Sequence, residues 1–268
     1  MKHPLISIIL STYNWSRYIK ESIESVLNQT YSNFEFIIIN DCSTDNVEQI
    51  VLNYSKKDNR IIYIKNEQNI KLTASLNKWL QLAKWKYIAR IDDDDLWMKN
   101  KLEKQVNFMN ENSEYWLCAT SFQVVNKNEI KNIQINTSNN KIKKDRLRQS
   151  KIWDSTVMYK RRINGELVQY DQNWNLVEDY ELWLRIWLTE KLYILPFILT
   201  KYRLNNWLSL NNKLEQLKLS IKVIKKYKNY YDNFYISLIY RKVLYYIIYI
   251  TLKLNIYKKV SYFYRKLF

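Results

Sequence analysis

The chain has 268 residues, 47% of them hydrophobic, and a formal net charge of +17. That hydrophobic fraction is ample for a buried core and argues against intrinsic disorder. One histidine, His3, and two distant cysteines, Cys42 and Cys118, exclude a zinc site, a histidine-dependent triad and a disulfide framework. A single glycine, Gly165, excludes the Gly-rich phosphate loops of dinucleotide-binding and P-loop folds.

The first hundred residues alternate between predicted strands and predicted helices. Short apolar runs without a helical period predict buried strands, at 5–10, 34–39, 61–64 and 87–91. Apolar residues at helical spacing predict helices between them, at 19–27, 47–54 and 72–83, with another from about 99. This alternation favours an α/β fold with a Rossmann-like, mostly parallel sheet covered on both faces.

The rest of the chain divides into two parts. Residues 113–205 are less regular, with strand-like runs around one clear helix near 179–189. Residues 206–268 have the pattern of helices and are rich in aromatic residues. We therefore predict one half of a domain at 1–112, a second half of the same domain at 113–205, and a C-terminal helical extension at 206–268.

The extension holds most of the positive charge. From Lys213 to Phe268 it carries thirteen Lys or Arg and two acidic residues. Basic helices of this kind can lie on an anionic membrane, but a helical appendage with an ordinary solvated face has the same composition. The longest uncharged run, Val243 to Leu252, has ten residues where a span needs about twenty, so we expect no transmembrane helix.

The N-terminal sequence and the cysteine content bear on location. The apolar run Leu5 to Leu10 is too short for the core of a signal peptide. The lack of a disulfide framework suits a reducing compartment. We expect a cytoplasmic protein, with peripheral attachment to the inner face of the membrane as the role open to 213–268.

Polar clusters follow three of the predicted strands, at Ser11 to Asn14, Asn40 to Asp45 and Asp92 to Asp95. In open parallel sheets, ligands bind beyond the carboxyl ends of the strands. The three clusters therefore predict a substrate pocket at one edge of the sheet. Asp45 is placed to cap the next helix, whereas Asp41, nearer the strand, can point toward a ligand.

The run Asp92 to Asp95 has two interpretations. Like charges this close repel one another, partial desolvation raises that cost, and a divalent cation such as Mg²⁺ or Mn²⁺ would relieve it. Alternatively, the run is a solvated acidic turn in which Asp95 caps the next helix. Its position directly after a buried strand, beside two other polar clusters, favours the cation site.

Four segments occur in order along the chain: Pro4 to Asn14 with Gln29 to Asp45, Tyr87 to Gln105, Val177 to Arg185, and Tyr202-Arg203. Together they resemble the motifs of family 2 glycosyltransferases, and the resemblance spans about 4–205. It implies a GT-A fold whose first half, 1–112, binds the nucleotide sugar and whose second half, 113–205, faces the acceptor. It also implies inverting transfer from a nucleotide-diphosphate sugar, a UDP-sugar first of all, to a hydroxyl of a glycan or lipid-linked acceptor.

The resemblance further implies roles for individual residues on the donor side. Thr12, Tyr13 and Asp41 would hold the nucleoside. Asp92 would lie by the ribose and the metal, and Asp94 would bind the metal, Mn²⁺ or Mg²⁺, directly. Asp93 would occupy the variable middle position of the motif, and Asp95 would be structural. The enzyme would be a hexosyl- or N-acetylhexosaminyltransferase of bacterial polysaccharide or lipopolysaccharide synthesis.

On the acceptor side, the resemblance makes Asp179 the general base. The residues alone leave this even with a second interpretation, in which Glu178 and Asp179 cap the following helix and interact with its dipole. The motif context favours the base. Arg203 is left between a contact to the diphosphate or the acceptor and a pairing with a structural carboxylate.

The chain departs from the family pattern on the donor side. Asn69-Ile-Lys71 stands where the family has NxG, Lys84-Trp-Lys86 lacks a glycine before the fourth strand, and Ser75-Leu-Asn77 lacks an arginine. These departures leave a non-catalytic relative that only binds a nucleotide sugar as an alternative. A nucleic-acid-binding module is a weaker rival, suggested by the charge and by 15% aromatic residues. The acidic strand ends argue against it, and we expect no nucleic-acid partner.

Overall fold

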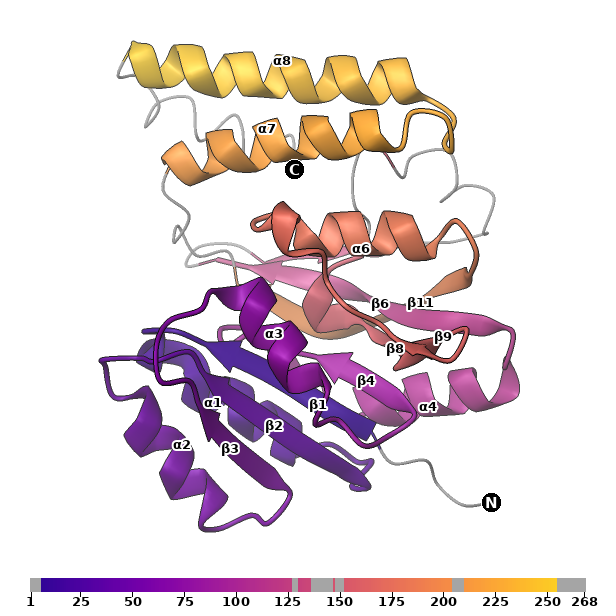
Figure 1. The fold of residues 1–268 in the computed structure, drawn as a ribbon. Coiled ribbons are helices and arrows are strands. Elements are labelled where there is room, and N and C mark those ends of the chain that lie inside the picture. Colours follow the sequence, from indigo (N-terminus) through magenta and orange to yellow (C-terminus); the bar gives the residue numbers. More distant parts are fainter. Residues whose placement is uncertain (1–5, 127–129, 136–146, 148–151, 204–209, 255–268) are drawn as a thin grey trace.

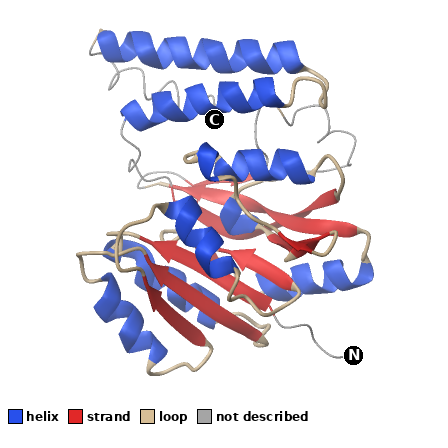
Figure 2. Ribbon diagram, viewed as in Figure 1, coloured by secondary structure: helices blue, strands red, loops and turns tan. Residues whose placement is uncertain are grey.

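A central mixed sheet of nine strands carries helices on both faces, and two long helices are stacked outside it (Figures 1 and 2). The computed structural model describes the chain except for residues 1–5, 127–129, 136–146, 148–151, 204–209 and 255–268. The strands of the sheet are β1 (Ile6–Thr12), β2 (Phe34–Asn40), β3 (Ile61–Lys65), β4 (Tyr87–Arg90), β5 (Leu96–Trp97), β6 (Tyr115–Val125), β7 (Ile130–Ile133), β8 (Met158–Lys160) and β11 (Lys191–Arg203). The helices are α1 (Ser16–Leu27), α2 (Val47–Ser55), α3 (Leu72–Leu80), α4 (Lys101–Glu111), α6 (Glu178–Ile186), α7 (Leu210–Lys226) and α8 (Phe234–Lys253). Smaller elements are the 3₁₀ turns η1 (Asp154–Thr156) and η2 (Gln172–Trp174), and a hairpin of β9 (Arg162–Ile163) and β10 (Glu166–Leu167).

The sheet has a parallel part and a mixed part. Its order is β3-β2-β1-β4-β8-β6-β11-β5, with β7 beside β6. β1 is parallel to β2 and β4, and β2 is parallel to β3. β8 is antiparallel to both β4 and β6, whereas β6 is parallel to β11. The predicted parallel sheet is therefore present in the first part of the chain, and the sequence after α4 extends it with strands of both directions.

Both faces of the sheet are buried, because successive residues of a strand point to opposite faces. In β1, Ile8 and Leu10 pack in the cluster that holds the apolar sides of α1, α2 and α4. Ile9 packs in the other cluster, with α3 and α6. A strand buried on both faces needs apolar residues at every position, which is why these strands are continuous apolar runs in the sequence.

Helix α6 is covered on two sides. Leu182, Trp183 and Ile186 pack in the cluster on the sheet. Tyr180 and Leu184 pack instead against residues of α7. α6 thus lies between the sheet and α7, and α8 lies on the far side of α7 (Figure 1).

Helix α8 differs from the expectation for the C-terminal extension. It has 20 residues and a mean hydropathy of 1.2 in its best window, so by length and composition it is able to cross a membrane. Arg241 and Lys242 interrupt the apolar sequence near its middle, and a search for an uncharged run therefore missed it. Length and composition alone do not establish a span, so the absence of a transmembrane helix stays a prediction. Only 22% of that window is buried within the protein.

Candidate active site

The acidic run Asp92 to Asp95 forms a turn just beyond the end of β4. Because β4 is buried between β1 and β8, the turn begins at a fixed point of the sheet. The fully buried side chain of Asp95 accepts a hydrogen bond from the backbone N–H of Arg203 at 3.0 Å. Asp95 therefore joins the turn to the end of β11 and does not cap α4, which begins only at Lys101.

A buried arginine lies beneath the turn. Arg90, the last residue of β4, pairs with Asp154 of η1 and with Asp92, whose Oδ1 lies 3.2 Å from the guanidinium. Burial opposes the charge of Arg90, but Asp154 and Asp92 outweigh it and raise the pKa of Arg90 above its usual value. The hydroxyl of Ser155 accepts the Asp92 N–H at 2.9 Å. Arg90 is thus a permanent positive charge that fixes Asp92 and reduces the repulsion among the aspartates.

The predicted base lies at the N-terminal end of α6, close to this turn. Burial raises the pKa of Asp179, the Tyr180 N–H and Arg90 lower it in part, and the charge of Asp92 raises it. Charges act on one another more strongly in a poorly solvated site, and the effect falls with distance, so Asp179 and Asp92 are neighbours. Residues that are far apart in the sequence, Asp92 and Asp179, are therefore brought to one site.

The neighbour of Asp179 is also a buried acid. Glu178 is 7% exposed, and burial together with the charge of Asp179 raises its pKa to about 7. The Oδ1 of Asp179 accepts the N–H of Tyr180 at 2.6 Å, which fixes the orientation of the carboxyl group. A carboxylate with a raised pKa is a stronger base than an exposed one, which is the property that proton abstraction needs.

An aromatic side chain of β11, in the second half of the chain, lies near the acidic turn. Burial raises the pKa of the Tyr202 hydroxyl, and so do four nearby carboxylates, those of Asp95, Asp94, Asp92 and Asp179. The ring of Trp153 lies beside Tyr202, with 4.5 Å between the two centroids. Two aromatic side chains, Tyr202 and Trp153, therefore lie beside the acidic cluster.

The predicted nucleoside-binding residues lie at the neighbouring strand ends. Thr12 ends β1 and is buried, Tyr13 follows it and is 49% exposed, and Asp41 follows β2 and is buried. The Asp41 N–H donates to the carbonyl of Thr12 at 2.9 Å, which holds the two strand ends together. Since β1 lies between β2 and β4, this group is next to the acidic turn. The structure thus brings all the predicted site residues to one edge of the sheet.

Asp41 is fixed by the connection between β3 and α3. Its Oδ1 accepts hydrogen bonds from Asn66 at 2.7 Å and from the N–H of Ile70 at 3.1 Å. The next residue, Lys71, has a φ of 71°. A positive φ favours glycine, so Lys71 adopts the backbone conformation that explains the glycine of the NxG pattern.

Asp45 also has the role predicted for it. Its two carboxylate oxygens accept the N–H of Val47 at 3.2 Å and the N–H of Ser16 at 2.8 Å. Val47 and Ser16 are the first residues of α2 and α1. Asp45 therefore caps two helices at once and is a structural residue at the donor edge.

The acidic turn suits a cation only together with a phosphate ligand. Among the described residues, no three His, Cys, Asp or Glu side chains lie close enough to hold an ion by themselves. Mg²⁺ in phosphate sites needs only one or two carboxylates, because substrate oxygens and water complete its coordination. Asp94 is 8% exposed and the Asp92 side chain is 39% exposed, and the two lie on one turn. This donor set fits a cation that binds with a diphosphate.

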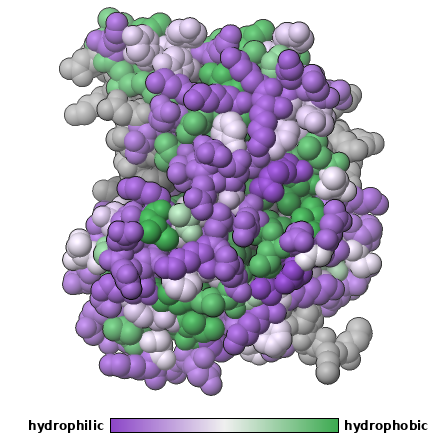
Figure 3. Space-filling view, in the orientation of Figure 1, coloured by the Kyte–Doolittle hydropathy of each residue, from purple (hydrophilic) through white to green (hydrophobic). Residues whose placement is uncertain are grey.

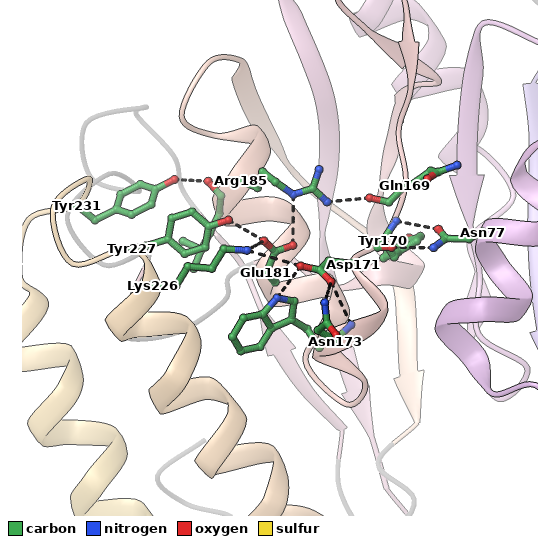
Figure 4. A network of polar contacts seen from close by, with 12 residues as sticks. Asn77, Gln169, Tyr170, Asp171, Asn173, Glu181, Arg185, Lys226, Tyr227 and Tyr231 are labelled. Carbon is green, nitrogen blue, oxygen red and sulfur yellow. Dashed lines mark hydrogen bonds and ion pairs between the residues drawn. The ribbon is translucent and has the colours of Figure 1, made fainter.

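A polar network fixes α6 to α7 (Figure 4). Glu181 is fully buried and accepts hydrogen bonds from Lys226 Nζ and Tyr227 Oη, both at 2.7 Å. Arg185 Nε lies 3.3 Å from the other carboxylate oxygen. Since removing a partner from a buried charge is strongly destabilising, these contacts set the position of α6 along α7.

The segment before α6 is held from two sides. The backbone of Tyr170 exchanges two hydrogen bonds with the Asn77 side chain, at 2.7 and 2.8 Å. The side chain of Gln216 on α7 donates to the carbonyl of Leu176 at 3.0 Å. Leu176 has a φ of 78°, a strained conformation for a branched residue. The backbone that leads into Glu178 and Asp179 is thus held in an unfavourable conformation by its neighbours.

The side chain of Arg203 is directed to another acid. Its guanidinium pairs with Glu21 and lies over the ring of Tyr18, 4.5 Å from the centroid. Arg203 thus pairs with a carboxylate, and its contact to the diphosphate or the acceptor stays a prediction.

Sequence reasoning missed the buried pair of Arg90 and Asp154. A signal for Arg90 existed, because a charged residue inside the apolar run 87–91 needs a buried partner. Asp154 has no such signal, since it lies in a short 3₁₀ turn of the irregular second half.

The sequence matches the family described as "Glycosyl transferase family 2" over residues 7–166. An uncharacterised glycosyltransferase of Methanocaldococcus jannaschii is 36% identical over 225 residues, which cover 82% of this chain and 77% of that protein. The UDP-Glc:alpha-D-GlcNAc-diphosphoundecaprenol beta-1,3-glucosyltransferase WfgD of Escherichia coli is 34% identical over 217 residues, covering 80% of this chain and 83% of that protein.

Two solved structures share the fold. S. aureus TarS 1-349 in complex with UDP-GlcNAc has a TM-score of 0.63 at 21% identity and covers 82% of this chain and 66% of its own. The mannosyltransferase PcManGT from Pyrobaculum calidifontis, in complex with GDP-Man and Mn²⁺, has a TM-score of 0.68 at 12% identity, covering 90% and 70%. Identities this low support the fold and no more.

The sheet, with its flanking helices and polar strand ends, has the GT-A fold. The chain belongs to glycosyltransferase family 2, and its chemistry is the transfer of a sugar from a nucleotide sugar. The predicted family and fold are therefore confirmed.

Proposed function

We propose that the protein is an inverting glycosyltransferase that moves a hexose or N-acetylhexosamine from a nucleotide diphosphate to a hydroxyl of a glycan or lipid-linked acceptor. The observation that carries this proposal is the position of Asp179 beside the turn Asp92 to Asp95. A UDP-sugar is the first candidate donor, since TarS is known in complex with UDP-GlcNAc and the WfgD name specifies UDP-Glc. The diphosphoundecaprenol acceptor in that name supports a lipid-linked acceptor.

On the donor side, Thr12, Tyr13 and Asp41 would bind the nucleoside at the ends of β1 and β2. Asp94 and Asp92 would hold Mn²⁺ or Mg²⁺ against the diphosphate, and the ion would neutralise the charge that develops on the leaving group. Arg90 would orient Asp92 through their ion pair. The PcManGT complex with Mn²⁺ supports a metal at this site.

On the acceptor side, Asp179 would take the proton of the attacking hydroxyl. The bond from the acceptor oxygen to the anomeric carbon forms as the bond to the phosphate oxygen breaks, so the anomeric configuration inverts. The raised pKa of Asp179 makes it a stronger base for this step. General-base assistance contributes roughly 10²–10⁴-fold in rate.

We further propose that the reaction takes place in the cytoplasm, at the inner face of the membrane when the acceptor is lipid-linked. The basic composition of 213–268 supports this location, because an anionic surface attracts such a segment. Synthesis of a bacterial polysaccharide or lipopolysaccharide is the setting that fits such an acceptor.

Thermal unfolding across a panel of nucleotide diphosphates, with and without Mn²⁺, tests the donor side. A ligand at a hundred times its Kd adds about 2.7 kcal/mol to the free energy of unfolding. We expect one nucleotide diphosphate of the panel to stabilise the wild type in a Mn²⁺-dependent manner. Asp94→Ala should lose this stabilisation. Equal stabilisation of wild type and Asp94→Ala would refute the metal assignment.

The rate of sugar transfer, measured with the donor that carries this nucleotide, tests Asp179 as the general base. We expect Asp179→Asn to keep the nucleotide-dependent stabilisation and to lose about 10²–10⁴-fold in kcat. Glu178→Gln is the matched control on the same helix end. NMR of the product anomer decides the stereochemistry, since a retained configuration would rule out a single displacement. Asp179→Asn with full transfer would refute the base assignment.

A further inference from the structure

Helix α8 turns a stripe of apolar side chains away from the protein. Its members lie three or four residues apart, which places them on one helical face. They are Ile236, Ile239, Val243, Tyr246 and Ile250, and each is at least 50% exposed. We call them the α8 stripe. Soluble proteins rarely leave a continuous apolar strip of this length in water.

The opposite side of α8 is used for packing. Leu244 and Ile248 lie in a cluster with Leu217 of α7, and Ser237 and Thr251 are buried on the same side. α8 is the outermost element in Figure 1, and in Figure 3 hydrophobic surface is visible over the two C-terminal helices. The α8 stripe is thus on the outside of the molecule, and the described part of the chain does not cover it.

The positive charge around the α8 stripe indicates what kind of surface binds it. α8 contains no acidic residue, and its exposed Lys242 and Lys253 flank the stripe. Exposed Lys222 and Lys225 on α7 add to the same field. Two copies pairing through their stripes would bring these like charges together, whereas an anionic bilayer offers both an apolar layer and the opposite charge. Tyrosines, of which Tyr235, Tyr246 and Tyr249 are exposed, suit the boundary between lipid and water.

We propose that α8 lies in the plane of an anionic membrane surface, with the α8 stripe inserted among the lipids. This deepens the location given under the proposed function and explains how the enzyme would reach a lipid-linked acceptor. The binding itself needs no transfer activity and is measured without donor or acceptor.

Although α8 has the length of a membrane span, two features favour the in-plane position. Arg241 and Lys242 lie near its middle, where a spanning helix would place them at the centre of the bilayer, a costly position. α8 is also packed on α7, which is joined to α6 through Lys226, Tyr227 and Glu181. If α8 spanned the membrane, it would have to separate from α7 or carry the lysines of α7 into the lipid.

Flotation of the full chain with vesicles tests the surface. We expect binding to vesicles of phosphatidylcholine with phosphatidylglycerol and much weaker binding to phosphatidylcholine alone. Ile239→Asp should lower the partition coefficient by about tenfold or more, because a charge replaces an inserted apolar side chain. The matched control is Ile130→Asp on β7, since Ile130 is 65% and Ile239 61% exposed. Equal losses in the two variants, or none in Ile239→Asp, would overturn the proposal.

Spin labels on the bound protein test the orientation. Labels at cysteines introduced for Ile236, Val243 and Ile250, in a Cys42→Ser background, sample one face of α8, and Cys118 is buried. An in-plane helix gives them similar depths. A spanning helix separates successive labels by about 10 Å along its axis, which would refute the in-plane position.

Two further measurements separate the alternatives. Light scattering in solution should give a monomer, and a dimer that Ile239→Asp dissociates would assign the stripe to a second copy. Nucleotide-dependent stabilisation should be equal in Ile239→Asp and wild type, which shows that the variant is folded. Vesicle binding without nucleotide binding would refute the proposed function and leave the membrane-surface proposal intact. Nucleotide binding without vesicle binding would refute the membrane-surface proposal and leave the proposed function intact.

Discussion

In this chain with one glycine, other residues adopt the positive φ values that glycine usually adopts. Lys71 and Leu176 have φ values of 71° and 78°, and both lie in segments that lead into site residues or helices near the site. Non-glycine residues in this region store strain, which tertiary contacts must offset. At Lys71 the contacts are at the donor edge, where Ile70 binds Asp41.

Lys71→Gly should therefore stabilise the protein. Glycine adopts this φ without a side-chain clash, and relief of the strain should raise the free energy of unfolding by about 1 kcal/mol. For a chain of this size, that corresponds to a rise in Tm of roughly 2–4 °C. Lys71→Ala removes the same charge but keeps a Cβ, so it should give no rise. Equal Tm values for the two variants would assign the effect to charge.

Glu178 makes stability depend on pH. Its pKa is about 7 in the folded protein against 4.5 for an ordinary glutamate, so between these values the folded state binds more protons than the unfolded state. The free energy of unfolding therefore falls as the pH rises through this range, by up to about 3 kcal/mol. Glu178→Gln keeps the uncharged form and should escape the loss. In urea unfolding at pH 5 and pH 8, the advantage of the variant should grow with pH, and a constant difference would contradict the assignment.

Individual site residues were predictable to the extent that they lie at strand ends. Thr12, Asp41 and Asp92 follow apolar runs, so the rule for parallel sheets locates them without a structure. Asp154 could not be found in this way, because its role depends on an ion pair with Arg90 across the chain.

At the scale of elements, α7 is a support for α6. Lys226 and Tyr227 bind the buried Glu181, two residues beyond the proposed base, and Gln216 binds the strained Leu176 just before it. A helix held at both its start and its first turns keeps Asp179 in place relative to the turn of β4. Geometry of this kind matters because a reacting group displaced by about 1 Å can cost about 10²-fold in rate.

Tyr227→Phe should lower kcat about tenfold or more, with the Kd for the nucleotide unchanged, because it removes one hydrogen bond to Glu181 far from the donor edge. The free energy of unfolding should fall by about 1–2 kcal/mol. Tyr230→Phe is the control, since Tyr230 is 64% exposed on the same connection. Measured kcat and nucleotide binding distinguish this result from general loss of structure, which would weaken both.

Long elements were predictable and short ones were not. The strands and helices of the first hundred residues carry enough apolar positions to show their period. β5 has two residues, and so do β9 and β10, which is too short for any pattern. α8 lies within the predicted helical extension, but its membrane-like length was not recognised, because Arg241 and Lys242 interrupt its apolar sequence.

At the scale of the whole molecule, the alternation of strands and helices predicts a parallel sheet, and the order β3-β2-β1-β4 fits it. The position of β8, β6 and β11 was not predictable from pattern, because it depends on pairings between distant segments. These pairings place Asp154, Tyr202 and α6 against the turn of β4. The second half of the site is thus a product of long-range packing.

The late position of β11 has a consequence for how the protein is made. β5 pairs with β11 through Trp97 and Thr200, so the segment after the acidic turn must wait for a strand that leaves the ribosome much later. The strands β1, β2, β3 and β4 are made early, but a domain generally folds as a unit. When the residues of the donor edge have been made, Asp179, Tyr202 and the N–H group that binds Asp95 are still missing from the growing chain. The complete site therefore exists only once synthesis has passed Arg203.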